Sequence, residues 1–367
     1  MKLSGLNLQN FKNYRELALT FSERLNCIVG LNGSGKTNLM DAIHYLAFTK
    51  SAFLATDNQN ICHEAPYFLL KGDFYTGSEK QILCYQERNQ KKVVKYDGKE
   101  YEKLSDHIGR IQVILHTPYD SEIIRDSSEY RRKWVDGCIS QHDHQYLEDL
   151  IRYQRILRHR NALLKQIEGR LSTSNSALLD MYDEQIVEYS IALNKKRETF
   201  VEEILPFFKE NITSIVGEKE QSSLSYKSMV SREQFSSEFH EAREKDLLLQ
   251  RTTLGAHRDD YLFYLENMPI RKFGSQGQQK SFLIALRLTQ YDYLKEKLNQ
   301  QPILLLDDVF DKLDDERIKK LIGLITDRQR FGQIFITDAR KDRSIELFDE
   351  VADKKIIEIT NGEANIL

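Results

Sequence analysis

The segment from Gly30 to Thr37 constrains this chain more than any other part of the sequence. It has the pattern G-x-x-x-x-G-K-T, which is typical of a phosphate-binding loop. The apolar run 25–29 before it fits a buried strand, and apolar residues at helical spacing follow it from Leu39 to Ala47. The sequence therefore predicts a strand, a glycine-rich loop and a helix whose N-terminus holds a phosphate.

Each residue type in this loop has a chemical reason. Glycines let backbone N–H groups turn towards a phosphate, some at positive φ. We expect Lys36 to reach the β- and γ-phosphates of ATP, and the hydroxyl of Thr37 to ligate Mg²⁺. The nucleotide-binding residues predicted in and beside the loop are Gly30, Leu31, Asn32, Gly33, Ser34, Gly35, Lys36, Thr37 and Asn38.

Composition narrows the range of functions. The 367-residue chain has a net charge of −3, so any contact with nucleic acid must come from local basic patches. Its four cysteines form no C-x-x-C pair, which argues against a disulfide framework or a zinc site and suits a reducing cytosol. No uninterrupted apolar run reaches ~18 residues, and the N-terminus has no signal-peptide pattern. We therefore expect a cytoplasmic protein without a membrane span.

Two further motifs follow far downstream of the loop. The apolar run 303–306 ends in Asp307 and Asp308, as a Walker B strand does. We expect Asp307 to hold Mg²⁺ and Asp308 to act as the catalytic acid that polarises the attacking water. Upstream, a short polar segment opens an apolar-striped helix and offers a hydroxyl and N–H groups at a positive helix end: Ser275, Gln276, Gly277 and Gln278. Taken alone, such a serine is more often a plain helix cap.

The N-terminal region predicts β structure around the loop. Alternating apolar residues predict two antiparallel strands before the P-loop strand, separated by a polar turn at 10–15. This turn either lies over the adenine base, with Lys12 and Asn13 as further ATP contacts, or is an ordinary hairpin loop. Residues 67–115 contain several strand-like runs separated by turn signals, and the last one breaks at His116-Thr117-Pro118.

The middle of the chain predicts a helical insertion. Apolar stripes at helical spacing predict helices at 143–167 and from 178 to 200, joined by a polar turn at 172–176. Two such helices make an antiparallel hairpin with arms of roughly 35–40 Å. We expect residues 201–251 to be a helical end of the same subdomain and 333–337 to be the last core strand. The predicted segments are an N-terminal head part at 1–120, a helical arm at 121–251 and a C-terminal head part at 252–367.

The order of these motifs resembles that of ABC-type ATPase heads. Lys312-Leu313-Asp314 looks like the D-loop of such heads, and His116 falls where their Q-loop should be. Within that superfamily the chain is similar to the RecF family of DNA-repair ATPases. The segments that carry this resemblance are 11–14, 130–136, 153–157, 255–260 and 274–280.

The resemblance implies an α/β fold: an ABC-type P-loop head with an antiparallel β subdomain and a mainly helical arm with a short hairpin. It implies ATP and Mg²⁺ as cofactors, weak DNA-dependent ATPase activity, and an ATP-dependent homodimer in which the signature segment docks on the opposite monomer's ATP. It also implies DNA binding at single-strand gaps and damaged replication sites. Recombination mediator proteins and a recombinase are the implied partners, and the SOS response is an implied context.

Three positions depart from the pattern of related heads. Asp311 stands where the D-loop usually has Ser, and Asp338 stands where transporters have a switch His. Asp308 is a shorter acid than the Glu of transporter heads. These departures leave the identity of the γ-phosphate sensor open.

Three other functions remain as alternatives. The ATPase subunit of a membrane transporter is disfavoured by the hairpin and by the signature Ser-Gln-Gly-Gln. A P-loop metabolic kinase would need no signature segment far downstream. A chromosome-organising ATPase with long coils is disfavoured by the short arm, unless the chain is a fragment.

Basic residues on the helical insertion are candidates for DNA contact. Arg152, Arg155 and His159 lie along one face of the helix predicted at 143–167. They form either a track for the phosphate backbone or a solvated surface balanced by Glu148 and Asp149. The candidate DNA-binding residues are Arg152, Arg155, Arg158, Arg131 and Arg132.

Overall fold

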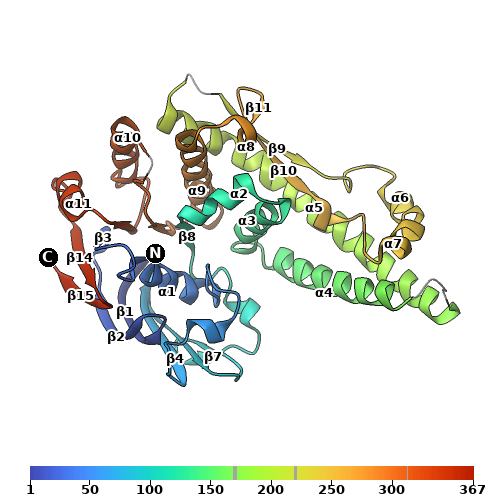
Figure 1. Ribbon diagram of the computed structural model, residues 1–367, viewed down its shortest axis with the longest axis horizontal. Coiled ribbons are helices and arrows are strands. Elements are labelled where there is room, and N and C mark those ends of the chain that lie inside the picture. The colour runs from blue at the N-terminus through green and yellow to red at the C-terminus, as the bar shows by residue number, and fades with distance from the viewer. Residues whose placement is uncertain (168–171, 219–220, 312) are drawn as a thin grey trace. The chain divides into compact units, whose positions relative to one another are not determined.

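The computed structural model describes residues 1–167, 172–218, 221–311 and 313–367 (Figure 1). The chain divides into two compact units. The head unit comprises Met1–Asp120, Glu210–Lys219 and Ser275–Leu367, and the arm unit comprises Ser121–Lys209 and Glu220–Gly274. Each unit has its own secondary structure and is described by itself.

The first sheet of the head unit is antiparallel and has six strands in the order β2-β1-β4-β5-β6-β7. Residues of β4 alternate between buried and half-buried, with Phe68, Leu70 and Phe74 pointing into the core, which is the period expected of a sheet with one covered face. The strands are β1 (Lys2–Phe11), β2 (Tyr14–Thr20), β4 (Tyr67–Tyr75), β5 (Glu79–Glu87), β6 (Val93–Tyr96) and β7 (Lys99–Glu100).

The second sheet of the head unit carries the predicted nucleotide site. Its strand order is β15-β14-β3-β13-β12-β8, with all neighbours parallel except β15. Every residue of β3, β12 and β13 is buried, as continuous apolar runs in a covered parallel sheet require. The strands are β3 (Leu25–Val29), β8 (Val113–His116), β12 (Ile303–Leu306), β13 (Ile334–Asp338), β14 (Lys354–Thr360) and β15 (Glu363–Ile366).

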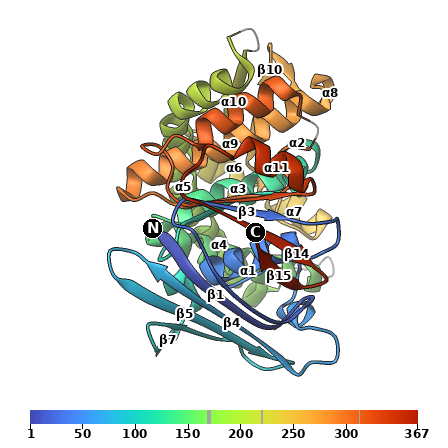
Figure 2. The same cartoon turned by 90° about the vertical axis from the view of Figure 1, so that its left-hand side faces the viewer.

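Helix α1 (Lys36–Phe48) packs between the two sheets of the head unit. It contacts β4 and β5 of the first sheet and β8 and β13 of the second, and Figure 2 shows it between β3 and the antiparallel strands. Leu39, Ile43 and Leu46 of α1 join both sheets in one hydrophobic core. The other helices of the unit are α9 (Gln276–Leu298), α10 (Asp315–Ile325) and α11 (Lys341–Leu347).

The arm unit is mainly helical. Helix α4 begins at His144, and the carboxylate of Asp143 caps it by accepting a hydrogen bond from the Tyr146 backbone N–H at 3.0 Å. A three-stranded antiparallel sheet, in the order β11-β10-β9, completes the unit. The elements are α2 (Ser121–Arg125), α3 (Ser128–Ser140), α4 (His144–Gln166), α5 (Thr173–Val216), β9 (Ser222–Lys227), α6 (Phe235–Glu241), α7 (Arg243–Leu249), β10 (Asp260–Leu265), β11 (Met268–Pro269) and α8 (Ile270–Phe273). The last residues of α5, from Glu210 on, belong to the head unit.

The architecture confirms the predicted α/β head with an antiparallel β subdomain and a helical arm. The two N-terminal strands, the P-loop strand and its helix, and the first helix of the hairpin lie where the sequence predicts them. No helix in the described part of the chain is long and apolar enough to cross a membrane.

Some details of the prediction are wrong. Helix α5 has 44 residues and continues to Val216, because Ile204, Phe208 and Ile212 extend its buried stripe beyond 200. It begins at Thr173, inside the turn predicted at 172–176. Residues 201–251 also contain strand β9, and β13 is not the last core strand, because β14 pairs with β3 on the other side. The unit boundary lies at 274/275, whereas the head was predicted to resume at 252.

Candidate functional site

The P-loop follows β3 directly and requires glycine at two positions. Gly30 has φ 151°, and a Cβ there would lie 2.4 Å from the carbonyl oxygen of Ile359. Gly35 has φ 119°, and a Cβ there would lie 2.5 Å from the Asn13 side chain. Both positions therefore exclude larger residues through backbone conformation and through space.

Lys36 and Ser34 place an ammonium group and a hydroxyl group inside the loop. The Lys36 ammonium donates hydrogen bonds to the carbonyl oxygens of Gly30 at 2.8 Å and Leu31 at 3.0 Å. The hydroxyl of Ser34 is buried and has no hydrogen-bond partner among the described residues. Because a buried hydroxyl without a partner is costly, a ligand oxygen in the loop would satisfy it. This arrangement fits a phosphate group.

The Walker B acid Asp307 lies beside Thr37, as the sequence predicts for a shared cation. The Thr37 hydroxyl donates to Asp307 Oδ2 at 2.9 Å, and the Thr337 hydroxyl donates to Oδ1 at 2.7 Å. Burial raises the pKa of Asp307 above its usual value, and the two threonine hydroxyls oppose that shift. Hydroxyl and carboxylate oxygens are the ligands that Mg²⁺ prefers, so Thr37 and Asp307 fit such an ion.

Asp308 lies at the border of the P-loop cavity in a constrained turn. Its φ is 46°, a left-handed conformation that is uncommon for residues other than glycine. Its backbone N–H donates to the Thr337 hydroxyl at 2.8 Å, and the Lys280 ammonium donates to its carbonyl oxygen at 2.9 Å. A cavity of about 250 Å³ is lined by this residue and by the loop: Asn32, Gly33, Gly35, Lys36, Thr37, Asn38 and Asp308.

A second cavity lies on the other side of Thr37 and Asn38 and is lined by aromatic and polar residues. Phe53 and Tyr119 form part of it, with ring centroids 5.6 Å apart. Asn13 also lines it and donates to the carbonyl oxygen of Ser34 at 3.2 Å. A flat base can stack on exposed aromatic rings, so this cavity has the chemistry for the adenine of a nucleotide bound in the loop.

Lys12 lies in the wall of the same cavity, but its ammonium is already paired. It forms an ion pair with the buried Asp41 at 2.5 Å and lies 5.2 Å from the centroid of the Phe53 ring. Asp41 also accepts hydrogen bonds from the Ser51 hydroxyl and the Ala52 backbone. Lys12 therefore positions the cavity wall in this structure, and its predicted contact with ATP would need the pair with Asp41 to open.

The signature segment forms the cap of α9. The Ser275 hydroxyl accepts a hydrogen bond from the Gln278 backbone N–H at 3.2 Å, and the Gln278 side chain accepts one from the Ser275 N–H at 2.9 Å. Ser275 and Gln276 are exposed, whereas Gly277 and Gln278 are half-buried. In a single chain, Ser275 therefore acts as the N-terminal cap of α9. Of the predicted D-loop, Lys312 lies outside the described residues.

The predicted DNA contacts fall into two groups. Arg152, Arg155 and Arg158 are exposed on α4, and Arg152 is also 3.5 Å from Glu148. Arg131 is only 8% exposed and donates to both carboxylate oxygens of Asp260, at 2.6 and 3.2 Å. The structure therefore argues against a direct DNA contact for Arg131.

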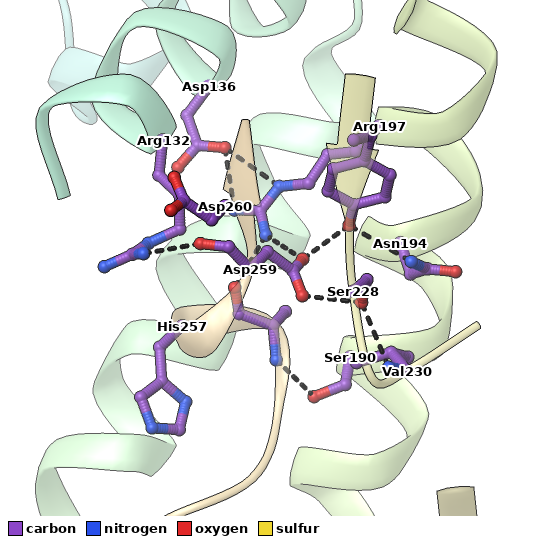
Figure 3. A network of polar contacts seen from close by, with 12 residues as sticks. Arg132, Asp136, Ser190, Asn194, Arg197, Ser228, Val230, His257, Asp259 and Asp260 are labelled. Carbon is purple, nitrogen blue, oxygen red and sulfur yellow. Dashed lines mark hydrogen bonds and ion pairs between the residues drawn. The ribbon is translucent and has the colours of Figure 1, made fainter. Parts of the chain in front are cut away.

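A buried polar network explains the position of the segment 255–260 (Figure 3). Arg197 of α5 donates to Asp259 at 2.7 Å and to Asp136 at 2.8 Å, so one guanidinium joins three segments. Arg132 donates to the carbonyl oxygen of Asp259 and is half-buried. Arg131, Arg132 and Asp136 lie in one segment that carries the family resemblance, and Asp259 and Asp260 lie in another. Internal hydrogen bonds and ion pairs thus hold these two segments together.

Several residues of the site were not predicted. Thr337 joins Asp307 and Asp308, yet a threonine at the end of a strand gives no sequence signal of this role. Lys280 fixes the Walker B turn from α9, and Tyr119 supplies a cavity ring that is distant from the P-loop in the sequence.

Known proteins resemble this chain over most of its length. A family model described as "RecF/RecN/SMC N terminal domain" matches residues 2–363. A protein from Cytophaga hutchinsonii named "DNA replication and repair protein RecF" is 44% identical over 346 residues, covering 94% of this chain and 91% of that protein. A protein of the same name from Bacteroides fragilis strain YCH46 is 39% identical over 369 residues, covering 100% and 98%.

Solved structures give the same result. The structure described as "recombination mediator protein RecF-ATPrS in RecFOR pathway" has a TM-score of 0.88 and 29% identity, covering 100% of this chain and 98% of that one. An Smc head bound to a domain of ScpA has a TM-score of 0.59 at 15% identity, which supports the fold alone. Because the family model matches residues 2–363 and the curated relatives align over most of both sequences, this chain belongs to the RecF family.

Proposed function

We propose that this protein binds ATP with Mg²⁺ in the P-loop of the head unit and hydrolyses it slowly. The observation that carries the proposal is the contact of the Thr37 hydroxyl with Asp307, 2.9 Å apart at the end of the buried sheet. Lys36 and Asp308 line the same cavity, and solved relatives are described as RecF-ATP and RecF-ATPrS. The RecF name of the relatives supports a role in DNA replication and repair.

The residues would divide the chemistry among them. The loop N–H groups and Lys36 bind the phosphates, and Thr37 with Asp307 would hold Mg²⁺, which supplies charge stabilisation at the β- and γ-oxygens. Asp308 orients the attacking water and accepts its proton. Asn13, Phe53 and Tyr119 form the cavity for the base.

We further propose that ATP brings two copies together head to head on DNA, with Ser275, Gln276, Gly277 and Gln278 completing the opposite ATP site. The exposed Ser275 and Gln276 support this arrangement, because an intermolecular contact needs an accessible segment. Arg152, Arg155, Arg158 and Arg132 are the proposed DNA contacts, with Arg155 and Arg158 free of any carboxylate within ion-pair distance among the described residues.

The wider role follows from the family. We propose a cytoplasmic protein whose ATPase depends on DNA and which acts at single-strand gaps and damaged replication sites. It would help mediator proteins to load a recombinase, in recombinational repair and during the SOS response. The solved relatives are described as acting in the RecFOR pathway, which supports the proposal that this protein works with mediator proteins. No observation on this chain favours the transporter alternative.

The proposal is tested by light scattering of the wild type and of Ser275→Arg, with ATP and gapped DNA added separately and together. We expect the wild-type mass to double with ATP and the variant to stay monomeric, because a large cation would block closure. Calorimetry is the control, since both proteins should bind ATP with similar affinity through the intact P-loop. If the variant dimerises like the wild type, Ser275 is only a helix cap and the shared site is wrong.

A further inference from the structure

The residue at the switch position, Asp338, has both carboxylate oxygens occupied by hydrogen bonds from within the chain. Its Oδ1 accepts hydrogen bonds from the Arg340 backbone N–H at 3.0 Å and from the Arg343 guanidinium at 2.6 Å. Its Oδ2 accepts from the Arg343 Nε at 3.0 Å and from the Ser344 hydroxyl at 2.8 Å. The side chain is buried, and a carboxylate carries no proton to donate to a phosphate oxygen. Asp338 therefore holds the turn that follows β13 in place through these hydrogen bonds.

The ion pairs near this turn determine which of its basic side chains can reach a ligand. Arg343 is committed to Asp338 and also stacks on Phe310, with its guanidinium carbon 5.4 Å from the ring centroid. The Lys341 ammonium forms an ion pair with Glu358 Oε2 at 3.0 Å. Arg340 is exposed, and its side chain forms no hydrogen bond or ion pair within the described ranges of the chain. Of these three cations, Arg340 alone is available to a ligand.

Arg340 lines a cavity that adjoins the proposed phosphate site. This cavity, of about 390 Å³, is also lined by Asn32, Asp308, Thr337 and Asp338. Asn32 and Asp308 line the P-loop cavity as well, so the two cavities meet at these residues. A terminal phosphate bound by Lys36 and attacked by a water beside Asp308 would face this junction. The cavity that Arg340 lines shares Asn32 and Asp308 with the P-loop cavity, and it shares no lining residue with the base cavity at Phe53 and Tyr119.

We propose that Arg340, two residues beyond the switch position at Asp338, is the catalytic γ-phosphate contact of this ATPase and takes the role that transporters give to a histidine. This inference rests on the ATPase function proposed above. The guanidinium donates two N–H groups to γ-phosphate oxygens, for which its planar fork is suited. In the reaction, the water oxygen bonds to the γ-phosphorus and its proton passes to Asp308. The bond from the γ-phosphorus to the β,γ-bridging oxygen breaks, giving ADP and inorganic phosphate. Arg340 stabilises the charge on the γ-oxygens as that bond breaks.

The experiment compares Arg340→Ala, Arg340→Lys and Lys341→Ala with the wild type. Single-turnover hydrolysis with protein in excess, in the presence of Mg²⁺ and gapped DNA, gives the rate of the chemical step, and calorimetry gives the affinities for ATP and ADP. For Arg340→Ala we expect a rate about 100-fold lower, as for the loss of one donor to a transition state. ATP affinity should fall by about three- to tenfold while ADP affinity stays unchanged, because only ATP has the γ-phosphate.

The two other variants test whether the effect depends on the guanidinium of Arg340 or on any positive charge near the site. Arg340→Lys keeps the charge without the fork, so its rate should lie between those of the wild type and Arg340→Ala. Lys341→Ala removes the neighbouring charge, whose partner Glu358 lies outside the cavity lining, and should hydrolyse ATP at the wild-type rate. A wild-type rate in Arg340→Ala, or an equal loss of ATP and ADP affinity, overturns the inference.

A Lys36→Ala variant in the same assays separates this inference from the proposed function. If Lys36→Ala loses ATP binding while Arg340→Ala behaves like the wild type, the P-loop assignment stands and Arg340 is not the contact. If Lys36→Ala binds and hydrolyses ATP normally, the proposed ATPase site itself is wrong, and the assignment of Arg340 falls with it.

Discussion

Replacing Arg197 by methionine should destabilise the arm unit strongly without leaving a large cavity. Arg197 is 2% exposed and donates to Asp136, to Asp259 and to the carbonyl oxygen of Ala256. Arg197→Met keeps most of the side-chain volume but removes the cation between two carboxylates. Removing one partner of a buried ion pair typically costs about 3–5 kcal/mol, because the remaining charge stays buried without compensation.

The sign of the pH dependence gives a second check on this variant. Burial raises the pKa of Asp259, and the charge of Arg197 works against that rise. Without Arg197 the pKa of Asp259 should rise further, so the carboxyl would take up a proton at a higher pH than in the wild type. A group whose folded pKa is raised stabilises the fold at low pH and loses that contribution as the pH increases. The loss of stability in Arg197→Met should therefore be larger at pH 8 than at pH 5.

The chain provides its own probe for this measurement. Its one tryptophan, Trp134, lies in α3 of the arm unit and packs edge-on against Phe200 of α5, with ring centroids 6.1 Å apart. Urea unfolding followed by tryptophan fluorescence therefore reports on the arm unit. Arg155→Met is the matched control, because Arg155 is exposed on α4 and should change the free energy of unfolding by less than about 0.5 kcal/mol. A change below about 1 kcal/mol in Arg197→Met would refute the argument that this guanidinium holds the network together.

Three further predictions concern the site, the arm surface and pH. Asp308→Asn should bind ATP with Mg²⁺ like the wild type but hydrolyse it at least about 100-fold more slowly. With ATP it should accumulate as a dimer. A wild-type rate of hydrolysis would exclude Asp308 as the base. Arg155→Glu with Arg158→Glu should reduce the slope of log DNA affinity against log salt by about 1.8, at about 0.9 per lost phosphate contact, in anisotropy titrations. An unchanged slope, or the same change from Lys195→Glu on α5, would contradict a phosphate track on α4. Burial lowers the pKa of His257 to about 4, so stability of the arm unit should fall as the pH decreases from about 6.5 towards 4, and His257→Asn should flatten this dependence in the fluorescence assay.

The parts of the fold that the sequence predicts are those whose signals are local. The strand, loop and helix around Lys36 are specified within a few turns of chain, since glycines, a lysine and an apolar stripe follow one another there. The same holds for β12 with Asp307 and for α4, whose cap residue Asp143 immediately precedes it. Each of these elements carries its own signal, either a continuous apolar run or an apolar stripe at helical spacing.

The missed elements depend on distant partners. Strand β9 has only Leu224 fully buried, and its alternation depends on just Leu224 and Tyr226, so the signal is short and its hydrogen bonds to β10 make it a strand. Strand β14 begins with two lysines and is specified by its pairing with β3. In the site, the pair of Lys12 with Asp41 and the clamp of Lys280 on the Walker B turn join residues whose charges could equally have faced solvent. Such contacts are decided by tertiary packing and not by any local pattern.

The left-handed conformation of Asp308 restricts which acids evolution can place there. Aspartate and asparagine tolerate positive φ better than other residues with a side chain, because their short polar groups can bond to the nearby backbone. The turn is held on both sides, by the Thr337 hydroxyl at the N–H of Asp308 and by Lys280 at its carbonyl oxygen. A glutamate at this position would need a different turn, and therefore compensating changes at positions 280 and 337. The length of the acid proposed as catalytic is thus tied to the backbone conformation that carries it.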